Sequence, residues 1–423
     1  MICVVVALLF TSYLTTADIE KPTIPEAEPE DEPETGETLS DLLNDFAFRL
    51  QKEVSDDENV VFSPFSIYSG LAMLYLGSST ETKQQLASAL KWNSENQDEK
   101  NFLEALKDLT DKLNPENGLD GVTLKTAAKG WLGQNFKILK KFNNNMKNQF
   151  GFKFSRKNFA QSESSRKDIN MWVANHTGNR INQLFPFGSF DAMTKVVLAN
   201  AIYFKGLWST PFKKKYTSLK NFYTQGSSKP KKVSTMFQSD DFLIGRHRNV
   251  QLLELPYGAE GEFSMLFARP LHQSELYGYE FAPDEFTSLA TLSKDMSSTL
   301  LREFQGSMRK TKVDVHIPRF TVERSINLAE KLQELGITKV FQQGTADLSP
   351  INGKRNLYVS SALHKAFIQV DEEGSEASGA TGIGISLLSL PPQVHMNRPF
   401  LFYIIHKPQN AVVFAGRVMD PSA

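Results

Sequence analysis

The chain has 423 residues, of which 40% are apolar and 11% aromatic, so it can bury a large core. Its net charge of −1 gives no sign of nucleic-acid binding, and no run of 18 apolar residues is present to span a membrane. Because no internal linker divides the chain, we expect one large domain over residues 38–423, acting as a monomer.

The first 17 residues differ from the rest of the chain. They carry no charge, contain an apolar run over residues 2–10, and end in the small-residue pattern of Thr15 and Ala17. This pattern predicts a signal peptide over residues 1–17 and a secreted, extracellular protein, with a buried amino-terminal strand as the alternative. The single cysteine, Cys3, lies in this segment, so a mature chain would have no disulfide and no thiol nucleophile.

Residues 18–37 form an acidic, proline-rich tail. Nine acidic residues against the single Lys21 give this tail a net charge of −8, so the remaining body carries +7. Such a composition cannot bury enough apolar area to fold alone, and we expect a disordered segment. The tail is either a solubilising spacer or a tether to a basic surface, on this body or on a partner.

Several segments of the body have clear secondary-structure patterns. Ser78 followed by Glu81 suggests a capping box before a helical run to Leu90. Residues 196–204 (VVLANAIYF) are apolar on both faces, which is typical of a central strand.

Patterns nearer the carboxyl terminus predict one more helix and a hairpin. The leucines at 328, 332 and 335 share one helical face, and Gly336 follows at a helix stop position. The strand-like runs 400–405 and 411–418 predict a buried hairpin. Helices come mainly first and strands dominate later, so we expect an α+β fold.

Motifs for catalysis are absent from the sequence. There is no Gly-x-Ser-x-Gly, no His-Glu-x-x-His, no Walker loop and no dinucleotide fingerprint. The seven histidines are scattered without metal-ligand spacing, and one in an apolar stretch, such as His364, is typical of a hydrogen-bonded core residue. We therefore expect neither an enzyme nor a bound metal or cofactor.

The segment 371–392 (DEEGSEASGATGIGISLLSLPP) is the most informative part of the sequence. Between Gly374 and Thr381 its only large side chain is Glu376. Every second residue from Ser375 to Ile385 is small or apolar, and alternate residues of a strand share one face. The segment can therefore be an exposed loop or a strand inside a sheet, which suits a switch.

This segment resembles the hinge of the serpin family, and further segments resemble other serpin motifs in the same order. These are residues 62–86 (FSPFSIYSGLAMLYLGSSTETKQQL), 198–212 (LANAIYFKGLWSTPF), 335–351 (LGITKVFQQGTADLSPI), 362–374 (ALHKAFIQVDEEG) and 397–421 (NRPFLFYIIHKPQNAVVFAGRVMDP). The resemblance covers the chain from about residue 40 to its end.

The resemblance implies a serpin fold, with three β-sheets, about nine helices and an exposed reactive-centre loop over 372–392. It also implies a suicide-substrate inhibitor. A serine protease cuts the loop and forms an acyl-enzyme, the cut loop inserts into the main sheet, and the protease is trapped. The energy of the added strand is withheld until the loop is cut.

The resemblance assigns residues in the loop. The hinge comprises Glu372, Gly374, Ser375, Glu376, Ala377 and Ser378. Counting from Gly374 with the loop length of antitrypsin-like serpins places the reactive bond at Leu388–Ser389, and a one-residue error would place it after Leu387. Leucine in either position suits the apolar specificity pocket of a chymotrypsin-like serine protease.

The resemblance also assigns residues in the body. A buried polar cluster called the shutter comprises Ser63, Ser66, Asn200 and His364. A group at the top of the main sheet, called the breach, comprises Trp208, Arg319 and Glu372. Asn175-His176-Thr177 is a glycosylation sequon.

Basic residues decide whether a glycosaminoglycan could bind. The stretch 99–113, which corresponds to the usual heparin-binding helix of the family, is mixed in charge and argues against that mode. The segment 133–160 has a base-rich run without acids: Lys137, Lys140, Lys141, Lys147, Lys153, Arg156 and Lys157. This run is either a solvated face or a site for a polyanion or the acidic tail.

Three functions follow from these observations. The first is inhibition of an extracellular chymotrypsin-like serine protease. The second is a non-inhibitory serpin acting as a carrier or storage protein, against which the small hinge residues Ser375, Ala377 and Ser378 argue. The third is inhibition of a thrombin-like protease recruited through the acidic tail.

Overall fold

The computed structural model describes residues 38–54, 57–92, 99–113, 121–151, 154–224, 229–272, 288–373 and 391–423. The predicted signal peptide and acidic tail lie outside the described residues. So do the reactive bond and most of the hinge, namely Gly374, Ser375, Glu376, Ala377, Ser378, Leu388 and Ser389.

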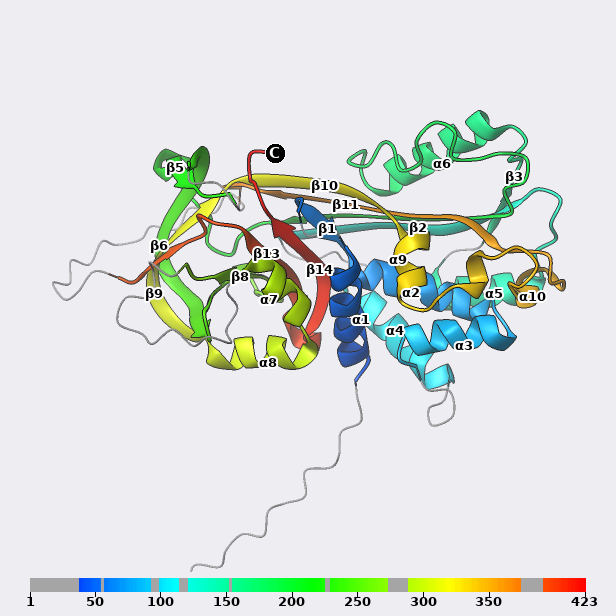
Figure 1. The fold of residues 1–423 in the computed structure, drawn as a ribbon, viewed down its shortest axis with the longest axis horizontal. Helices are drawn as coiled ribbons and strands as arrows, with labels where there is room; N and C mark the ends of the chain where they lie inside the picture. The colour runs from blue at the N-terminus through cyan, green and yellow to red at the C-terminus, as the bar shows by residue number, and fades with distance from the viewer. Residues whose placement is uncertain are drawn as a thin grey trace, which may run out of the picture. The chain divides into compact units, whose positions relative to one another are not determined.

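Helices form most of the amino-terminal part of the body (Figure 1). They are α1 (Leu39–Glu53), α2 (Pro64–Leu76), α3 (Thr80–Ala89), α4 (Glu99–Leu113), α5 (Lys140–Phe150) and α6 (Ser162–His176). Helix α2 is buried along nearly its whole length, because 11 of its 13 residues are buried. It therefore forms the centre of the helical layer.

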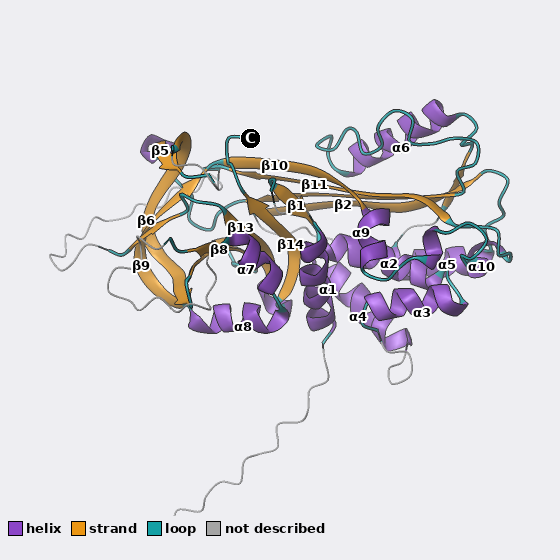
Figure 2. Ribbon diagram, viewed as in Figure 1, coloured by secondary structure: helices purple, strands orange, loops and turns teal. Residues whose placement is uncertain are grey.

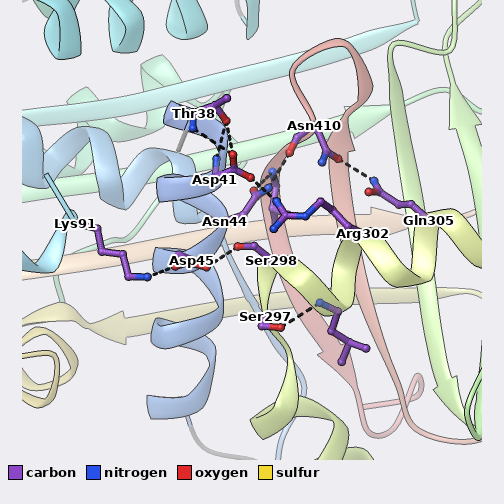
Figure 3. Close-up of polar contacts among 12 residues, drawn as sticks. Thr38, Asp41, Asn44, Asp45, Lys91, Ser297, Ser298, Arg302, Gln305 and Asn410 are labelled. Carbon is purple, nitrogen blue, oxygen red and sulfur yellow. Dashed lines mark hydrogen bonds and ion pairs between the residues drawn. The ribbon is translucent and has the colours of Figure 1, made fainter. Parts of the chain in front are cut away.

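Helix α1 is fixed at its start by polar contacts that come from distant parts of the chain (Figure 3). Thr38 and Asp41 form a capping box, and Asp41 also pairs with Arg302 at 2.7 Å. One turn further, the Asn44 amide donates to the Asn410 carbonyl at 2.8 Å. These contacts tie the first helix to residues more than 250 positions away.

The capping box predicted at Ser78 is wrong. Helix α3 begins at Thr80 with Ser79 as its N-cap, and the Ser79 side chain makes no capping hydrogen bond. The Ser78 hydroxyl instead donates to the Tyr75 carbonyl at 2.9 Å, at the end of the preceding helix. Two adjacent serines made the sequence ambiguous, and tertiary contacts decided where the helix starts.

A five-stranded sheet lies across the middle of the fold in the order β10-β11-β4-β2-β3. Its strands are β2 (Val122–Gly133), β3 (Ser155–Lys157), β4 (Val196–Gly206), β10 (Phe320–Asn327) and β11 (Val359–Val370). The prediction of a central strand over 196–204 is confirmed, because β4 lies in the middle of this sheet and is buried on both faces.

Helices cover both faces of this sheet (Figure 2). Helix α6 packs on one face, where Trp131 of β2 meets Trp172 of the helix edge to face, with ring centroids 5.2 Å apart. Helices α2 and α9 (Leu328–Glu334) lie on the other face. The predicted helix ending at Gly336 is confirmed, and that glycine adopts a left-handed φ of +89°.

The other strands form a second hydrogen-bonded sheet in the order β1-β14-β13-β8-β7-β6-β9-β12, with β5 on β6. They are β1 (Val60–Phe62), β5 (Ser218–Phe222), β6 (Lys231–His247), β7 (Val250–Tyr257), β8 (Phe263–Pro270), β9 (Arg309–Pro318), β12 (Gln393–His395), β13 (Phe400–His406) and β14 (Ala411–Val418). The predicted hairpin is confirmed as β13 and β14, which are fully buried.

Strand β6 explains why the described strands form two hydrogen-bonded sheets where the resemblance implies three. It is 17 residues long and pairs with β5 over residues 231–235, with β9 over residues 235–244 and with β7 over residues 243–247. One strand thus continues from one ladder into the next. The remaining helices are α7 (Leu289–Asp295), α8 (Ser298–Ser307) and α10 (Ser349–Asn352), so the fold is α+β with ten α-helices in the described residues.

Candidate functional site

The centre of the candidate site is the parallel pair of β4 and β11. The two strands pair in parallel from Val196 with Val359 to Phe204 with Ile368, with one register shift between Val359 and Ser361. Strand β11 leads directly into the loop, since it ends at Val370. A chain that leaves β11 and folds back between the two strands would run antiparallel to both. It would replace one parallel ladder by two antiparallel ladders, which are slightly more stable per residue.

The four predicted shutter residues lie together beneath this pair. The Ser66 hydroxyl donates to Asn200 Oδ1 at 2.7 Å, and the Asn200 amide donates back to the Ser66 carbonyl at 2.7 Å. The Ser63 hydroxyl donates to the Val413 carbonyl of β14 at 2.7 Å. Ser63 therefore joins α2, at whose N-cap it stands, to the larger sheet.

His364 completes the cluster in a single tautomer. The Ser63 backbone N–H donates to His364 Nε2 at 3.0 Å, so Nε2 is an acceptor and carries no proton. Nδ1 then holds the proton and donates it to Asn200 Oδ1 at 2.7 Å. Burial lowers the pKa of His364 to about 3, so the ring is neutral at pH 7. The interpretation of His364 as a hydrogen-bonded core residue is confirmed.

The predicted breach residues also lie together, at the end of β11 next to the loop. The Glu372 carboxylate is buried, and it lies 3.5 Å from the Arg319 Nε. Trp208 donates its indole N–H to the Asp371 carbonyl at 3.0 Å and stacks on Tyr257 at 4.3 Å between centroids. The arrangement holds Asp371 and Glu372, where the predicted hinge begins, against the top of the sheet.

Two further residues of this region, Thr217 and Lys214, were not predicted from the sequence. The Thr217 hydroxyl donates to Glu372 Oε1 at 2.6 Å, which is shorter than the contact of Arg319. Lys214 pairs with Glu373 at 3.2 Å, and this hydrogen bond, with help from Lys205, lowers the pKa of Glu373. Both residues belong to the turn before β5, and neither sequence spacing nor charge pattern could have linked them to the loop.

The sequon is accessible in the fold. Asn175 is exposed in the last turn of α6, while Thr177 is buried and donates its hydroxyl to the Val173 carbonyl at 2.9 Å. Asn175 therefore presents its amide to solvent, although the threonine of the sequon serves as a structural residue of the helix end.

The basic residues fall on two different surfaces. Helix α4 carries lysines that pair with acids four residues away, including Lys100 with Glu104 and Lys112 with Asp108. Most of the base-rich run is exposed on and around α5. Lys157 pairs with Asp168 at 2.6 Å, and Lys153 lies outside the described residues.

The part of the chain that the structure describes contains neither a candidate metal site nor a candidate membrane-spanning helix. No group of three or more metal-ligating side chains occurs there. No helix in those ranges is both long and apolar enough to cross a membrane.

Comparisons with known proteins match nearly the whole body of the chain. A family model described as "Serpin (serine protease inhibitor)" matches residues 41–421. The chain is 35% identical to a serine protease inhibitor of Cyanea capillata, covering 87% of this chain and 93% of that one. It is also 35% identical to leukocyte elastase inhibitor A of Rattus norvegicus, covering 91% and 100%.

Solved structures give the same result. Uncleaved ovalbumin matches with a TM-score of 0.81 and 29% identity, covering 91% of this chain and 100% of that chain. Native protease nexin-1 with heparin matches with a TM-score of 0.80 and 30% identity, covering 90% and 99%. The chain therefore belongs to the serpin family of serine protease inhibitors and is not an enzyme.

Proposed function

We propose that this serpin is secreted and inhibits chymotrypsin-like serine proteases by trapping them on its cleaved loop. The observation that carries the proposal is the parallel pair of β4 and β11, held by the shutter beneath it and by the breach at its end. This pair is the place where a strand that continues β11 can enter the sheet and be bonded on both sides.

The proposed reaction uses the protease's own chemistry. The protease serine attacks the Leu388 carbonyl, the acyl-enzyme forms, and the amino group of Ser389 leaves with the carboxyl-terminal part of the chain. The segment from Ser375 onward is then free to enter between β4 and β11. Entry forms new ladder hydrogen bonds and buries apolar area, which supplies the energy that distorts the attached protease.

The contacts of the shutter and the breach oppose insertion of a strand before the loop is cut. Entry must separate β4 from β11, which breaks the contact between Asn200 and His364. Entry must also move the chain that follows Glu372. The Glu372 side chain is itself held by Thr217 and Arg319. We infer that these contacts give the uncleaved form its kinetic stability.

Secretion is proposed on the uncharged, apolar leader of residues 1–17. The exposed position of Asn175 is compatible with a glycan at this residue. We also expect a monomer.

The proposal is tested by mixing the purified chain with chymotrypsin, leukocyte elastase, trypsin and thrombin. Elastase is included because several relatives are named leukocyte elastase inhibitors. A complex that survives SDS, with cleavage at Leu388–Ser389, is expected for chymotrypsin or elastase. If the loop is cut without a complex, and the cleaved chain gains no heat stability, the carrier function replaces the inhibitor.

A further inference from the structure

Strand β12, which follows the loop, rests on the edge of the larger sheet by few contacts. It pairs in parallel with β9 over only three residues, Gln393 to His395. Two flanking hydrogen bonds extend this ladder, from the Asp314 N–H to the Pro392 carbonyl and from the Met396 N–H to the His316 carbonyl, both 2.9 Å. Anything that bonds across this edge will therefore affect the strand next to the reactive loop.

A cavity of about 430 Å³ opens beside this strand, between β5, β6, β9 and β12. Its polar lining is basic or neutral, and comprises Lys220, Asn221, Tyr223, Lys232, Thr235, His316, His395 and Asn397. No carboxylate lines it among the described residues. Because a water molecule occupies about 30 Å³ of the liquid, the cavity can hold a tetrahedral oxyanion together with several waters.

The two histidines of the cavity are stacked. Their ring centroids are 4.4 Å apart and the ring planes differ by 11°, because His316 and His395 are direct partners in the ladder between β9 and β12. His395 Nε2 meets Gln393 Oε1 at 3.0 Å. Two imidazoles this close repel each other when both are charged, unless a negative group lies beside them.

Two buried polar atoms at the cavity have no partner within the described ranges. They are the His316 Nδ1 and the Asn397 Oδ1. Orphaned buried groups cost stability and call for an explanation such as a bound ion or water. A protonated Nδ1 becomes a donor, and the Asn397 amide can present its NH₂ after a half-turn.

We propose that this cavity is a binding site for a tetrahedral oxyanion, sulfate or phosphate, either free in solution or carried on a sulfated polysaccharide. Lys220 of β5 lies on the same sheet face as His316 and supplies fixed positive charge. A protonated His316 ring adds a positive charge at the wall of the cavity, and His395 places the site on β12. The site lies at the other end of the fold from the lysines of α4 and α5 (Figure 1), and its assignment does not depend on the inhibitory function.

Oxyanion binding at this site is coupled to protonation of His316. Burial, followed by the charges of His395 and Lys220, lowers the pKa of His316 to about 4, while Asp314 on the same strand opposes that shift. A bound oxyanion favours the charged ring and raises this pKa. Protons are then taken up on binding, so affinity rises as the pH falls, by at most about tenfold per pH unit.

The first experiment measures the Tm of the full chain against sodium sulfate, with sodium chloride at equal ionic strength as the reference, at pH 5.5 and 7.5. Sulfate stabilises most proteins by exclusion from their surfaces, so variants are required. Lys220→Gln and His316→Gln alter the cavity, whereas Lys213→Gln changes an exposed lysine outside it. We expect a saturable rise of about 2 °C for the unaltered chain and for Lys213→Gln, larger at pH 5.5, and only the unsaturable rise for the other two.

A second readout guards against variants that fold poorly. The imidazole resonances of the seven histidines are followed by NMR in the unaltered chain and in Lys220→Gln. The proposal requires the His316 resonance to move with sulfate in the unaltered chain and to move much less in Lys220→Gln. Amide exchange in β12 should slow when sulfate is present. Equal sulfate responses in both chains would overturn the site.

Further measurements distinguish a free oxyanion from one that is carried on a polysaccharide. Inorganic phosphate and a heparin tetrasaccharide are compared with sulfate in the same assays. If only the tetrasaccharide moves His316, and Lys220→Gln removes the effect, the site takes sulfate carried on a polysaccharide. If none of the three probes depends on Lys220 or His316, the cavity is not an oxyanion site.

Discussion

His364 and Asn200 are direct partners across the parallel ladder of β11 and β4, with 2.7 Å between His364 Nδ1 and Asn200 Oδ1. The same imidazole accepts from the Ser63 N–H through Nε2. Both ring nitrogens are thus committed to neutral hydrogen bonds in a buried site. The contact between these two side chains spans the line along which a strand would enter the sheet.

The first prediction concerns pH and this histidine. The folded-state pKa of about 3 lies below the ordinary value of 6.5, so the unfolded chain binds more protons at acid pH. The free energy of unfolding should fall as the pH drops from 6.5 towards 3, by up to about 1.4 kcal/mol per pH unit from this residue. His316 and His406, whose pKa values burial lowers to about 4, add to the loss.

Replacing His364 should lower stability and flatten this pH dependence. His364→Gln leaves buried groups imperfectly paired, which should cost about 1–3 kcal/mol at pH 7.5. Between pH 6.5 and 5 the variant should lose about 2 kcal/mol less than the unaltered chain. Denaturant unfolding at both pH values measures this, with exposed His272→Gln as the control. An unchanged pH slope in His364→Gln would contradict the assignment.

The second prediction ranks the two partners of Glu372. Thr217→Val removes a 2.6 Å hydrogen bond to a buried carboxylate and should cost about 1.5–3 kcal/mol. Arg319→Ala should cost only about 0–1 kcal/mol, because the arginine side chain is 48% exposed and its contact measures 3.5 Å. Unfolding of the uncleaved chain compares the two variants, and a larger loss for Arg319→Ala would reverse the ranking.

The third prediction tests insertion of the cut loop. Ser375→Arg would place a charge inside the sheet, at a cost of several kcal/mol, so insertion should slow and the acyl-enzyme should hydrolyse. The variant should then be cut as a substrate and form little stable complex. Glu376→Arg is the matched control, because alternate residues of a strand face opposite sides. The measurement is the ratio of covalent complex to cleaved inhibitor for each variant. Similar ratios for the two variants would contradict insertion.

The fourth prediction locates the reactive bond. Leu388→Arg should reduce inhibition of chymotrypsin-like enzymes and increase that of trypsin-like enzymes, each by at least about tenfold, since an acidic pocket prefers a cation. Association rates with chymotrypsin and trypsin measure the change. If only Leu387→Arg produces it, the bond lies one residue earlier.

The fifth prediction concerns the acidic tail. Deleting residues 18–37 removes a charge of −8, so association with a protease that carries a basic surface should slow by about tenfold at low salt. The difference should vanish near 1 M salt, where charges are screened within about 3 Å. A chain with the acids changed to their amides controls for length. Equal rates at every salt concentration would leave the tail as a spacer.

Local patterns predicted much of the fold. The strand at 196–204, the helix ending at Gly336 and the carboxyl-terminal hairpin all follow from periodicity and stop residues, and the structure contains each of them. The start of α3 was missed because Ser78 and Ser79 are both good caps, and only the contacts of the folded chain choose between them.

Contacts between distant residues could not be predicted from pattern. Ser63 and His364 are 301 positions apart, and only the resemblance to a family placed them together. Thr217 has no signal in the sequence, because a hydroxyl near a turn is common and its partner lies 155 positions away. The stack of His316 on His395 depends on strand register, which composition does not reveal.

The packing of α6 on the five-stranded sheet places two tryptophans where their intrinsic fluorescence depends on the fold. Of its four tryptophans, Trp131 and Trp172 meet edge to face between sheet and helix, and the Lys129 ammonium lies 5.3 Å from each ring. A third, Trp208, stacks on Tyr257 at the end of β11. Since indole emission responds to nearby charges and ring contacts, a widening sheet would change the intrinsic fluorescence. Trp208, which donates to the Asp371 carbonyl at the end of β11, thus provides an unlabelled fluorescence signal for changes at this end of the sheet.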